Sequence, residues 1–117
     1  MFLTLNHQKL EVYAASKAFT LECYRFTKQL PADEKFGMIS QIRRAALSVH
    51  LNIAEGASRK SIVERKRYFE ISRGSIIEID AALDIAFELK YISNYDTSAL
   101  EKKTIKCFRL LSGLIAS

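Results

Sequence analysis

The fold is decided by residues 33–64, which read DEKFGMISQIRRAALSVHLNIAEGASRKSIVE. Apolar side chains recur there at steps of three and four residues, the spacing of one helix face, at Phe36, Ile39, Ile42, Ala46, Val49 and Ile53. Asp33 is a favourable N-cap for this helix, and Gly56 is a natural residue for its end. Ser61 and Glu64 then form the pattern of a capping box. The stretch therefore predicts two consecutive helices joined by a short turn.

The same periodicity predicts one more helix on each side of this pair. The first runs from about Asn6 to Gln29 and stops at Leu30-Pro31, because the residue before a proline is disfavoured in a helix. Its expected core face comprises Leu10, Tyr13, Ala14, Ala18, Leu21 and Cys23, joined by Phe19 and Phe26. The third helix is expected to reach about Ile92, and the last follows a second capping-box pattern, Ser98 to Glu101.

Short connections make consecutive helices run in opposite directions. The sequence therefore predicts an all-α protein, an antiparallel up-and-down four-helix bundle in which residues 1–117 form one domain. A hydrophobic content of 49% is enough for a core without a metal or a disulfide. Cys23 and Cys107 lie in apolar helical patterns and are expected to be buried, reduced thiols. No signal peptide or membrane span is visible, so we expect a cytoplasmic protein with no membrane partner.

The residue patterns of enzymes and metal proteins are missing from the sequence. His50 has no ligand-type residue three or four positions away, and no Glu-x-x-His pair is present. No glycine-rich phosphate loop and no pattern of an activated nucleophile occurs. The acidic residues between Glu78 and Glu88 are interpreted as a solvated charged face. We therefore expect no catalytic residue, no metal and no cofactor.

Basic residues are concentrated in the middle of the chain. Between Arg43 and Arg73, eight basic residues stand against three acidic ones, whereas the remaining residues hold ten of each. The eight are Arg43, Arg44, Arg59, Lys60, Arg65, Lys66, Arg67 and Arg73. The first seven of these are expected to lie near one end of the bundle and form a patch. Two interpretations stay open: an ordinary solvated surface, or a patch that contacts a polyanion such as RNA or DNA.

Two motifs resemble the four-helix bundle family of 23S rRNA intervening-sequence proteins. Residues 41–49 read QIRRAALSV and residues 52–56 read NIAEG, matching a Q-x-R-R-A-x-x-S segment that leads into N-I-A-E-G. Gly74, Ser75 and Glu78 match a later G-S-x-x-E step, and Pro31 to Glu34 matches P-x-x-E. The signature positions are Gln41, Arg43, Arg44, Asn52, Glu55, Gly56, Gly74, Ser75 and Glu78. One departure is His50, where the family commonly has proline.

The resemblance implies a small bacterial protein, often encoded within insertions in ribosomal RNA genes, whose biochemical role is not established. A related branch, the accessory proteins of diversity-generating retroelements, resembles homopentameric basic barrels that bind nucleic acid and a reverse transcriptase. A homopentamer is therefore expected here. The signature residues either bind a ligand or fix packing, with Arg43 or Arg44 pairing with Glu55 or Glu78 and Asn52 bonding to backbone.

Together these observations favour a nonenzymatic, oligomeric protein that binds RNA or DNA with weak sequence specificity. The alternative is a protein-interaction module that docks a partner such as a reverse transcriptase through the same surface. A third hypothesis, an uncharacterised enzyme, lacks a supporting residue pattern.

Overall fold

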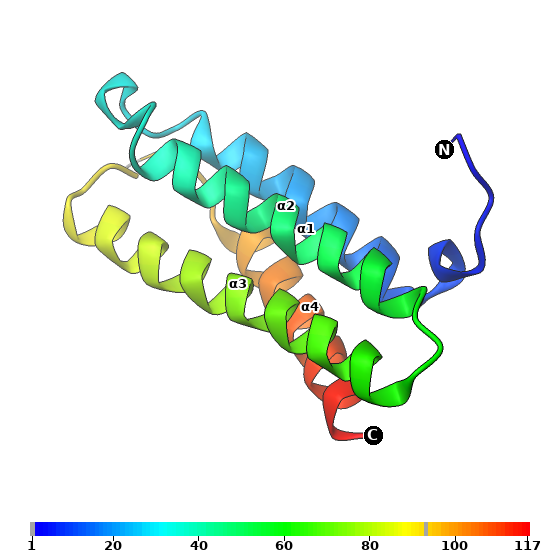
Figure 1. The fold of residues 1–117 in the computed structure, drawn as a ribbon. Coiled ribbons are helices and arrows are strands. Elements are labelled where there is room, and N and C mark those ends of the chain that lie inside the picture. Colours follow the sequence, from blue (N-terminus) through cyan, green and yellow to red (C-terminus); the bar gives the residue numbers. More distant parts are fainter. Residues whose placement is uncertain (1, 93) are drawn as a thin grey trace.

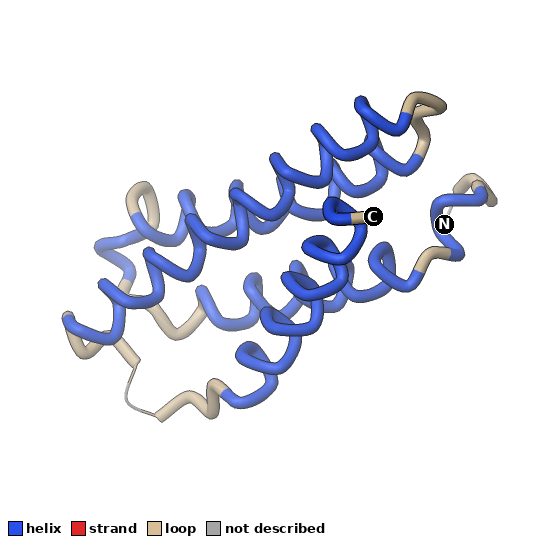
Figure 2. The backbone as a smooth tube through the Cα atoms, turned by 90° about the horizontal axis from the view of Figure 1, so that it is seen from below, coloured by secondary structure: helices blue, strands red, loops and turns tan. Residues whose placement is uncertain are grey.

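Four long helices pack into an elongated bundle in a computed structural model that describes residues 2–92 and 94–117. They are α1 (Glu11–Thr27), α2 (Met38–Ala57), α3 (Ile62–Glu88) and α4 (Ser98–Ala116), with short 3-10 helices η1 (Asn6–Lys9) and η2 (Ala32–Glu34) before the first two. Each helix contacts the next along the chain, and α4 returns to contact α1. Consecutive helices run in opposite directions within extents of 44 × 31 × 25 Å (Figure 1). The predicted all-α four-helix bundle is confirmed, and short loops join its helices (Figure 2).

Every helix contributes large side chains to one apolar core. The main contributors are Phe19, Phe26, Ile42, Val49, Ile53, Phe69, Ile76, Ile79, Leu100 and Leu111. Buried hydroxyls cross-link the helices at its edge. The Thr20 hydroxyl donates to the Ala46 carbonyl at 3.0 Å, and the Ser72 hydroxyl donates to the Val49 carbonyl at 2.7 Å. These bonds satisfy polar groups that are costly to bury unpaired, and they fix how α1 and α3 lie against α2.

The predicted core face of the first helix is correct for its aromatic residues but wrong for three aliphatic ones. Tyr13, Phe19, Cys23 and Phe26 are buried, whereas Leu10, Ala14 and Leu21 are exposed and Ala18 is half-buried. Val12, Ala15 and Ser16 are buried in their place. Ser16 is hidden because its hydroxyl donates to the Tyr13 carbonyl. A prediction that counts only apolar residues leaves such a hydrogen-bonded serine out of the core.

Helix α2 begins five residues later than Asp33. The chain forms η2 instead, and the Glu34 carboxylate accepts the Met38 backbone N–H at 3.1 Å, supplying the cap from outside the helix. Phe36, expected in the core, lies in this turn and is fully exposed at 89%. Glu34 also contacts the connection between α3 and α4, since the Tyr91 hydroxyl donates to its carboxylate at 2.9 Å.

Helix α3 begins as predicted and ends earlier than predicted. The Ser61 hydroxyl accepts the Glu64 backbone N–H, so the N-cap is confirmed. The helix stops at Glu88 because Lys90 adopts a left-handed backbone, with φ of 58°. The N–H groups of Lys90 and Tyr91 then bond to the carbonyls of Phe87 and Ala86, the hydrogen-bond pattern of a Schellman motif.

The predicted cap of the last helix is displaced by one residue. Ser98 is the first residue of α4, and its backbone N–H donates to the Asp96 carboxylate at 3.0 Å.

Gly56 allows α2 and α3 to approach each other near the turn that joins them. A Cβ atom on Gly56 would lie 2.8 Å from the Tyr68 Cβ, 3.0 Å from the Phe69 ring and 3.1 Å from the Arg65 carbonyl oxygen. Gly74, inside α3, makes no such close contact within the subunit, because a Cβ there meets nothing within 4 Å. The two signature glycines therefore differ in role within the subunit.

The two cysteines lie in the core as free thiols, as the sequence predicts. Burial raises the pKa of both Cys23 and Cys107 to about 12, so neither thiol ionises near neutral pH. Among the described residues, every helix is too short or too polar to cross a membrane.

Candidate nucleic-acid interface

The turn between α2 and α3 presents five basic side chains, which we call the basic turn: Arg59, Lys60, Arg65, Lys66 and Arg67. The local fold follows from Ser61, whose backbone carbonyl accepts the Arg65 N–H at 3.0 Å in the first turn of α3. Residues 55–67 contain only two acidic residues, Glu55 and Glu64. The turn therefore carries a positive excess of three charges.

Arg59 is the most constrained member of the basic turn. Its guanidinium lies 5.2 Å from the centroid of the Tyr68 ring and donates to the Tyr68 hydroxyl at 3.2 Å. It also pairs with Glu55 at 3.3 Å. Because Glu55 offsets its charge and the ring restricts its motion, Arg59 shapes the turn more than it attracts an anion.

Three members of the basic turn have no partner in the described part of the chain. The side chains of Lys60, Arg65 and Arg67 form no hydrogen bond or ion pair there, and Lys60 and Arg67 are exposed. The Lys66 side chain is restrained, since its ammonium donates to the Ser117 carbonyl at 2.6 Å. Among the described residues, Lys60, Arg65 and Arg67 are thus the basic side chains of the turn that no partner restrains or neutralises.

Arg43 belongs to the packing between α1 and α2. Its guanidinium lies 5.0 Å from the centroid of the Tyr24 ring, and its Nε donates to the Thr27 hydroxyl at 2.8 Å. Sixteen residues separate it from Arg59, which is about 24 Å along a helix. The expectation that Arg43 and Arg44 join the patch at the end of the bundle is therefore wrong.

Arg73 is likewise engaged, between α3 and α4. Its guanidinium lies 6.0 Å from the Phe108 ring centroid and donates to the Ser112 hydroxyl at 3.2 Å. Arg43 and Arg73, two of the eight basic residues in the middle of the chain, therefore contact aromatic rings on neighbouring helices and do not belong to the basic turn.

Arg43 faces α1, whereas Arg44 lies over the groove between α2 and α3. A shallow depression of about 290 Å³ opens there, lined by Gln41, Arg44, Ala45, Ser48, Ser75 and Glu78. Hydrogen bonds between polar side chains join α2 and α3 there, and the Ser75 hydroxyl donates to the Ser48 hydroxyl at 3.2 Å. The Asn52 amide donates to the same hydroxyl at 3.0 Å and to the Ser48 carbonyl at 2.9 Å.

His50 takes part in packing. Its Nδ1 lies 2.7 Å from the Ser16 hydroxyl, and its ring lies 4.6 Å from the Tyr13 ring centroid. Burial, with smaller contributions from Lys17 and His7, lowers the pKa of His50 below 6.5. Within residues 2–92 and 94–117, no three His, Cys, Asp or Glu side chains gather closely enough to hold a metal ion.

A family model described as 23S rRNA-intervening sequence protein matches residues 8–113. The chain belongs to this family. A solved structure of a protein of unknown function from the S23 ribosomal protein family of Bacteroides thetaiotaomicron VPI-5482 has the same fold, with a TM-score of 0.80 at 22% sequence identity. That match covers 91% of this chain and 96% of the other. No curated protein matched the chain.

The family signature divides into residues that pack and residues that face solvent. Gly56 permits the α2–α3 approach, Glu55 pairs with Arg59, and Asn52 bonds to backbone as one interpretation expected. The expected pairing of Arg43 with an acidic residue is wrong, because its partner is Thr27. Five signature residues are exposed on the surface of α2 and α3: Gln41, Arg44, Glu55, Gly74 and Glu78.

Sequence reasoning missed a cluster that holds the α3–α4 connection onto α1. Glu22 is buried and accepts hydrogen bonds from the Tyr95 hydroxyl, from Lys103 at 3.0 Å and from Arg25 at 2.9 Å. The Tyr95 bond is the main reason that the pKa of Glu22 is lowered, and burial opposes it. The spacing of Glu22 and Arg25 suits a helical ion pair, whereas Tyr95 and Lys103 are too distant in the chain for any local signal.

Proposed function

We propose that this protein is a nonenzymatic nucleic-acid-binding protein that uses the basic turn to contact the phosphates of RNA or DNA. The observation that carries this proposal is the uncompensated charge of Lys60, Arg65 and Arg67 on one turn of the bundle. Long, solvated basic side chains suit phosphate contacts because they need no shared geometry with a particular base. Binding of this kind has weak sequence specificity and weakens as salt rises.

Two exposed aliphatic residues lie within the same turn. Ile62 and Val63 are 68% and 80% exposed, directly between Lys60 and Arg65 in the sequence. In this proposal they contact the sugars of the bound strand while the basic side chains contact its phosphates. The basic turn would then bind a nucleic acid through mixed charged and apolar contacts.

The proposal includes assembly into a homo-oligomer, with a pentamer as the form that the family resemblance implies. An oligomer repeats the basic turn once in each subunit, and linked sites raise the apparent affinity without any new contact. Exposed aliphatic side chains on α2 and α3 support assembly, among them Leu47, Leu51 and Ile71 at 43%, 55% and 44% exposure. Light scattering of the purified protein measures the oligomeric state.

A gel-shift titration with single-stranded RNA and duplex DNA tests the proposal. The test variant carries Lys60→Ala, Arg65→Ala and Arg67→Ala. A matched control removes the same charge elsewhere through Lys17→Ala, Lys28→Ala and Lys102→Ala, three exposed lysines on α1, its C-cap and α4. We expect the test variant to lose binding and the control to keep most of it. Equal losses would indicate nonspecific attraction to net charge, and unchanged binding by the test variant would refute the proposal.

A further inference from the structure

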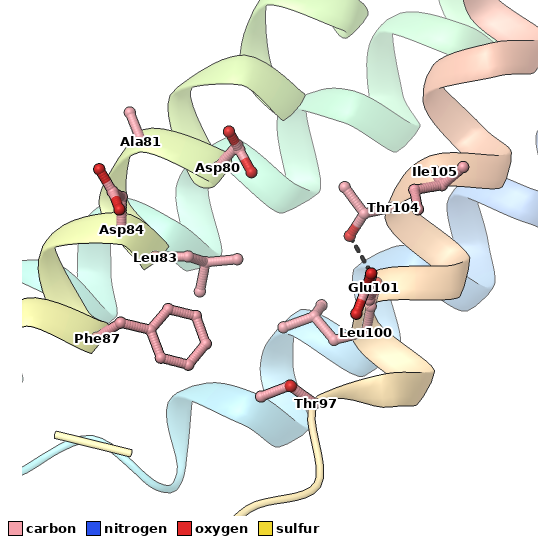
Figure 3. Close-up of a pocket in the computed structure, with 10 residues that line it drawn as sticks. All are labelled: Asp80, Ala81, Leu83, Asp84, Phe87, Thr97, Leu100, Glu101, Thr104 and Ile105. Atoms are coloured by element: carbon pink, nitrogen blue, oxygen red, sulfur yellow. Dashed lines mark hydrogen bonds between the residues drawn. The ribbon is translucent and has the colours of Figure 1, made fainter. Parts of the chain in front are cut away.

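An open groove separates α3 from α4 at the end of the bundle away from the basic turn. Its volume is about 710 Å³, and both helices line it (Figure 3). Leu83 and Phe87 extend from α3 toward α4, and Leu100 faces them from α4 (Figure 3). Phe87 and Ile105, which also line it, are 48% and 42% exposed. The groove therefore offers an apolar surface that the fold itself leaves uncovered.

The charged residues that line this groove are all acidic. They are Asp80 and Asp84, one helical turn apart on α3, and Glu101 on α4. None of the three carboxylates forms a hydrogen bond or an ion pair with another residue in the described ranges. Their combined negative charge is therefore not offset within the groove.

Two lysines of α4 that have acidic partners turn to the other side of the helix. The Lys103 ammonium lies 3.0 Å from Glu22, and the Lys106 ammonium lies 3.9 Å from Glu11, both on α1. This arrangement places positive charge on the α1 side of α4 and negative charge on the α3 side. The molecule as a whole is basic, so an acid-lined apolar groove is a local departure from its overall charge.

We propose that the α3–α4 groove binds a cationic amphipathic helix of a partner protein. The apolar side chains of that helix contact Phe87, Leu100 and Ile105, and its lysines or arginines pair with Asp80, Asp84 and Glu101. The groove residues from Asp80 to Phe87 span about 10 Å of helix, which suits about two turns of a docked helix with anchors three and four residues apart. Opposite charges at the rim favour encounter and set the orientation of the partner.

The groove and the basic turn are independent surfaces. Asp80 lies thirteen residues beyond Arg67 on α3, about 20 Å along the helix. A nucleic acid on the basic turn and a basic helix in the groove can therefore be bound at the same time. The inference does not rest on nucleic-acid binding, and the two fail separately under test.

Fluorescence anisotropy with two labelled model peptides tests the groove. One is a helix-forming peptide of leucine and lysine, and the other has the same leucine pattern with glutamate in place of lysine. The lysine peptide should bind saturably and the glutamate peptide should not. The variant Asp80→Asn, Asp84→Asn, Glu101→Gln should weaken binding of the lysine peptide by about tenfold or more, because it removes three opposite charges.

A matched variant, Asp33→Asn, Glu70→Gln, Glu88→Gln, removes three exposed acidic residues outside the groove and should bind the lysine peptide like the wild type. Ile105→Ala should also weaken binding, since it removes apolar surface without changing charge. Equal binding of both peptides, or an unaffected groove variant, would overturn the inference. So would a groove variant that splits the oligomer in light scattering, because a second copy would then fill the groove. A gel shift of the groove variant keeps this outcome separate from nucleic-acid binding.

Discussion

Replacing glycine by alanine should have opposite effects on stability at Gly56 and Gly74. Both positions lie inside helices, where alanine is favoured over glycine by about 1 kcal/mol. At Gly74 the added methyl group meets nothing within 4 Å, so Gly74→Ala should raise the free energy of unfolding by about that amount. At Gly56 the same methyl group collides with α3.

The size of the Gly56 effect follows from the atoms that the new methyl group meets. It would lie 2.8 Å from the Tyr68 Cβ and 3.1 Å from the Arg65 carbonyl oxygen, both closer than ordinary contact. Neither atom can turn aside as a side-chain tip would, so α3 must move away by roughly half an ångström, and overpacking of this kind costs about 1–3 kcal/mol. A cost near the upper part of that range, less the helix preference, gives a net loss of about 1–2 kcal/mol.

Urea unfolding of the wild type and both variants, at one fixed protein concentration, measures the two effects. Fixed concentration matters because association contributes to apparent stability. A Gly56→Ala variant as stable as the wild type would refute the close approach of α2 and α3. A Gly74→Ala variant that loses stability would contradict the open position of Gly74 and indicate that another subunit packs against it.

Further predictions concern the helix end, two titrating groups and one arginine. Lys90→Gly should stabilise the fold by about 1 kcal/mol, whereas Lys90→Ala should not, because only glycine adopts the left-handed backbone without cost; urea unfolding compares them. Burial lowers the pKa of His50 below 6.5, so its stabilising contribution is complete above pH 6.5 and is lost as the pH falls through the lowered value; His50→Gln should flatten that part of a stability–pH profile. The Tyr95 hydrogen bond lowers the pKa of Glu22 from 4.5, so its contribution is complete above pH 4.5 and is lost in more acidic solution; Glu22→Gln should remove that loss. Arg43→Met should reduce the free energy of unfolding by about 1–2 kcal/mol through lost contacts with α1, yet leave the gel shift unchanged.

Local sequence signals predicted most of the fold because they act within one helix. Apolar spacing placed Ile42, Val49 and Ile53 in the core, and the Ser61 cap marked the start of α3. The errors at the helix ends arise where a residue has a role that its type does not indicate. The start of α2 depends on a carboxylate outside the helix, Glu34, and the end of α3 depends on a lysine in a conformation that usually marks glycine.

The candidate interface was predictable in composition and only partly in geometry. Counting charges located the basic turn, since its five members are close in sequence. Counting could not show that Arg43 and Arg73 lie against aromatic rings of other helices, because those rings come from distant parts of the chain. The acid-lined groove was interpreted as a solvated face, since only the packing of α4 shows how its carboxylates and apolar residues meet.

The most direct test of phosphate binding at the basic turn is the dependence of duplex-DNA affinity on salt concentration. A plot of the logarithm of the binding constant against the logarithm of salt concentration has a slope of about −0.9 for each phosphate neutralised. The Lys60→Ala, Arg65→Ala, Arg67→Ala variant should make that slope shallower by up to about 2.7 for each bound subunit. A wild-type affinity indifferent to salt, or the same slope in both proteins, would contradict the account.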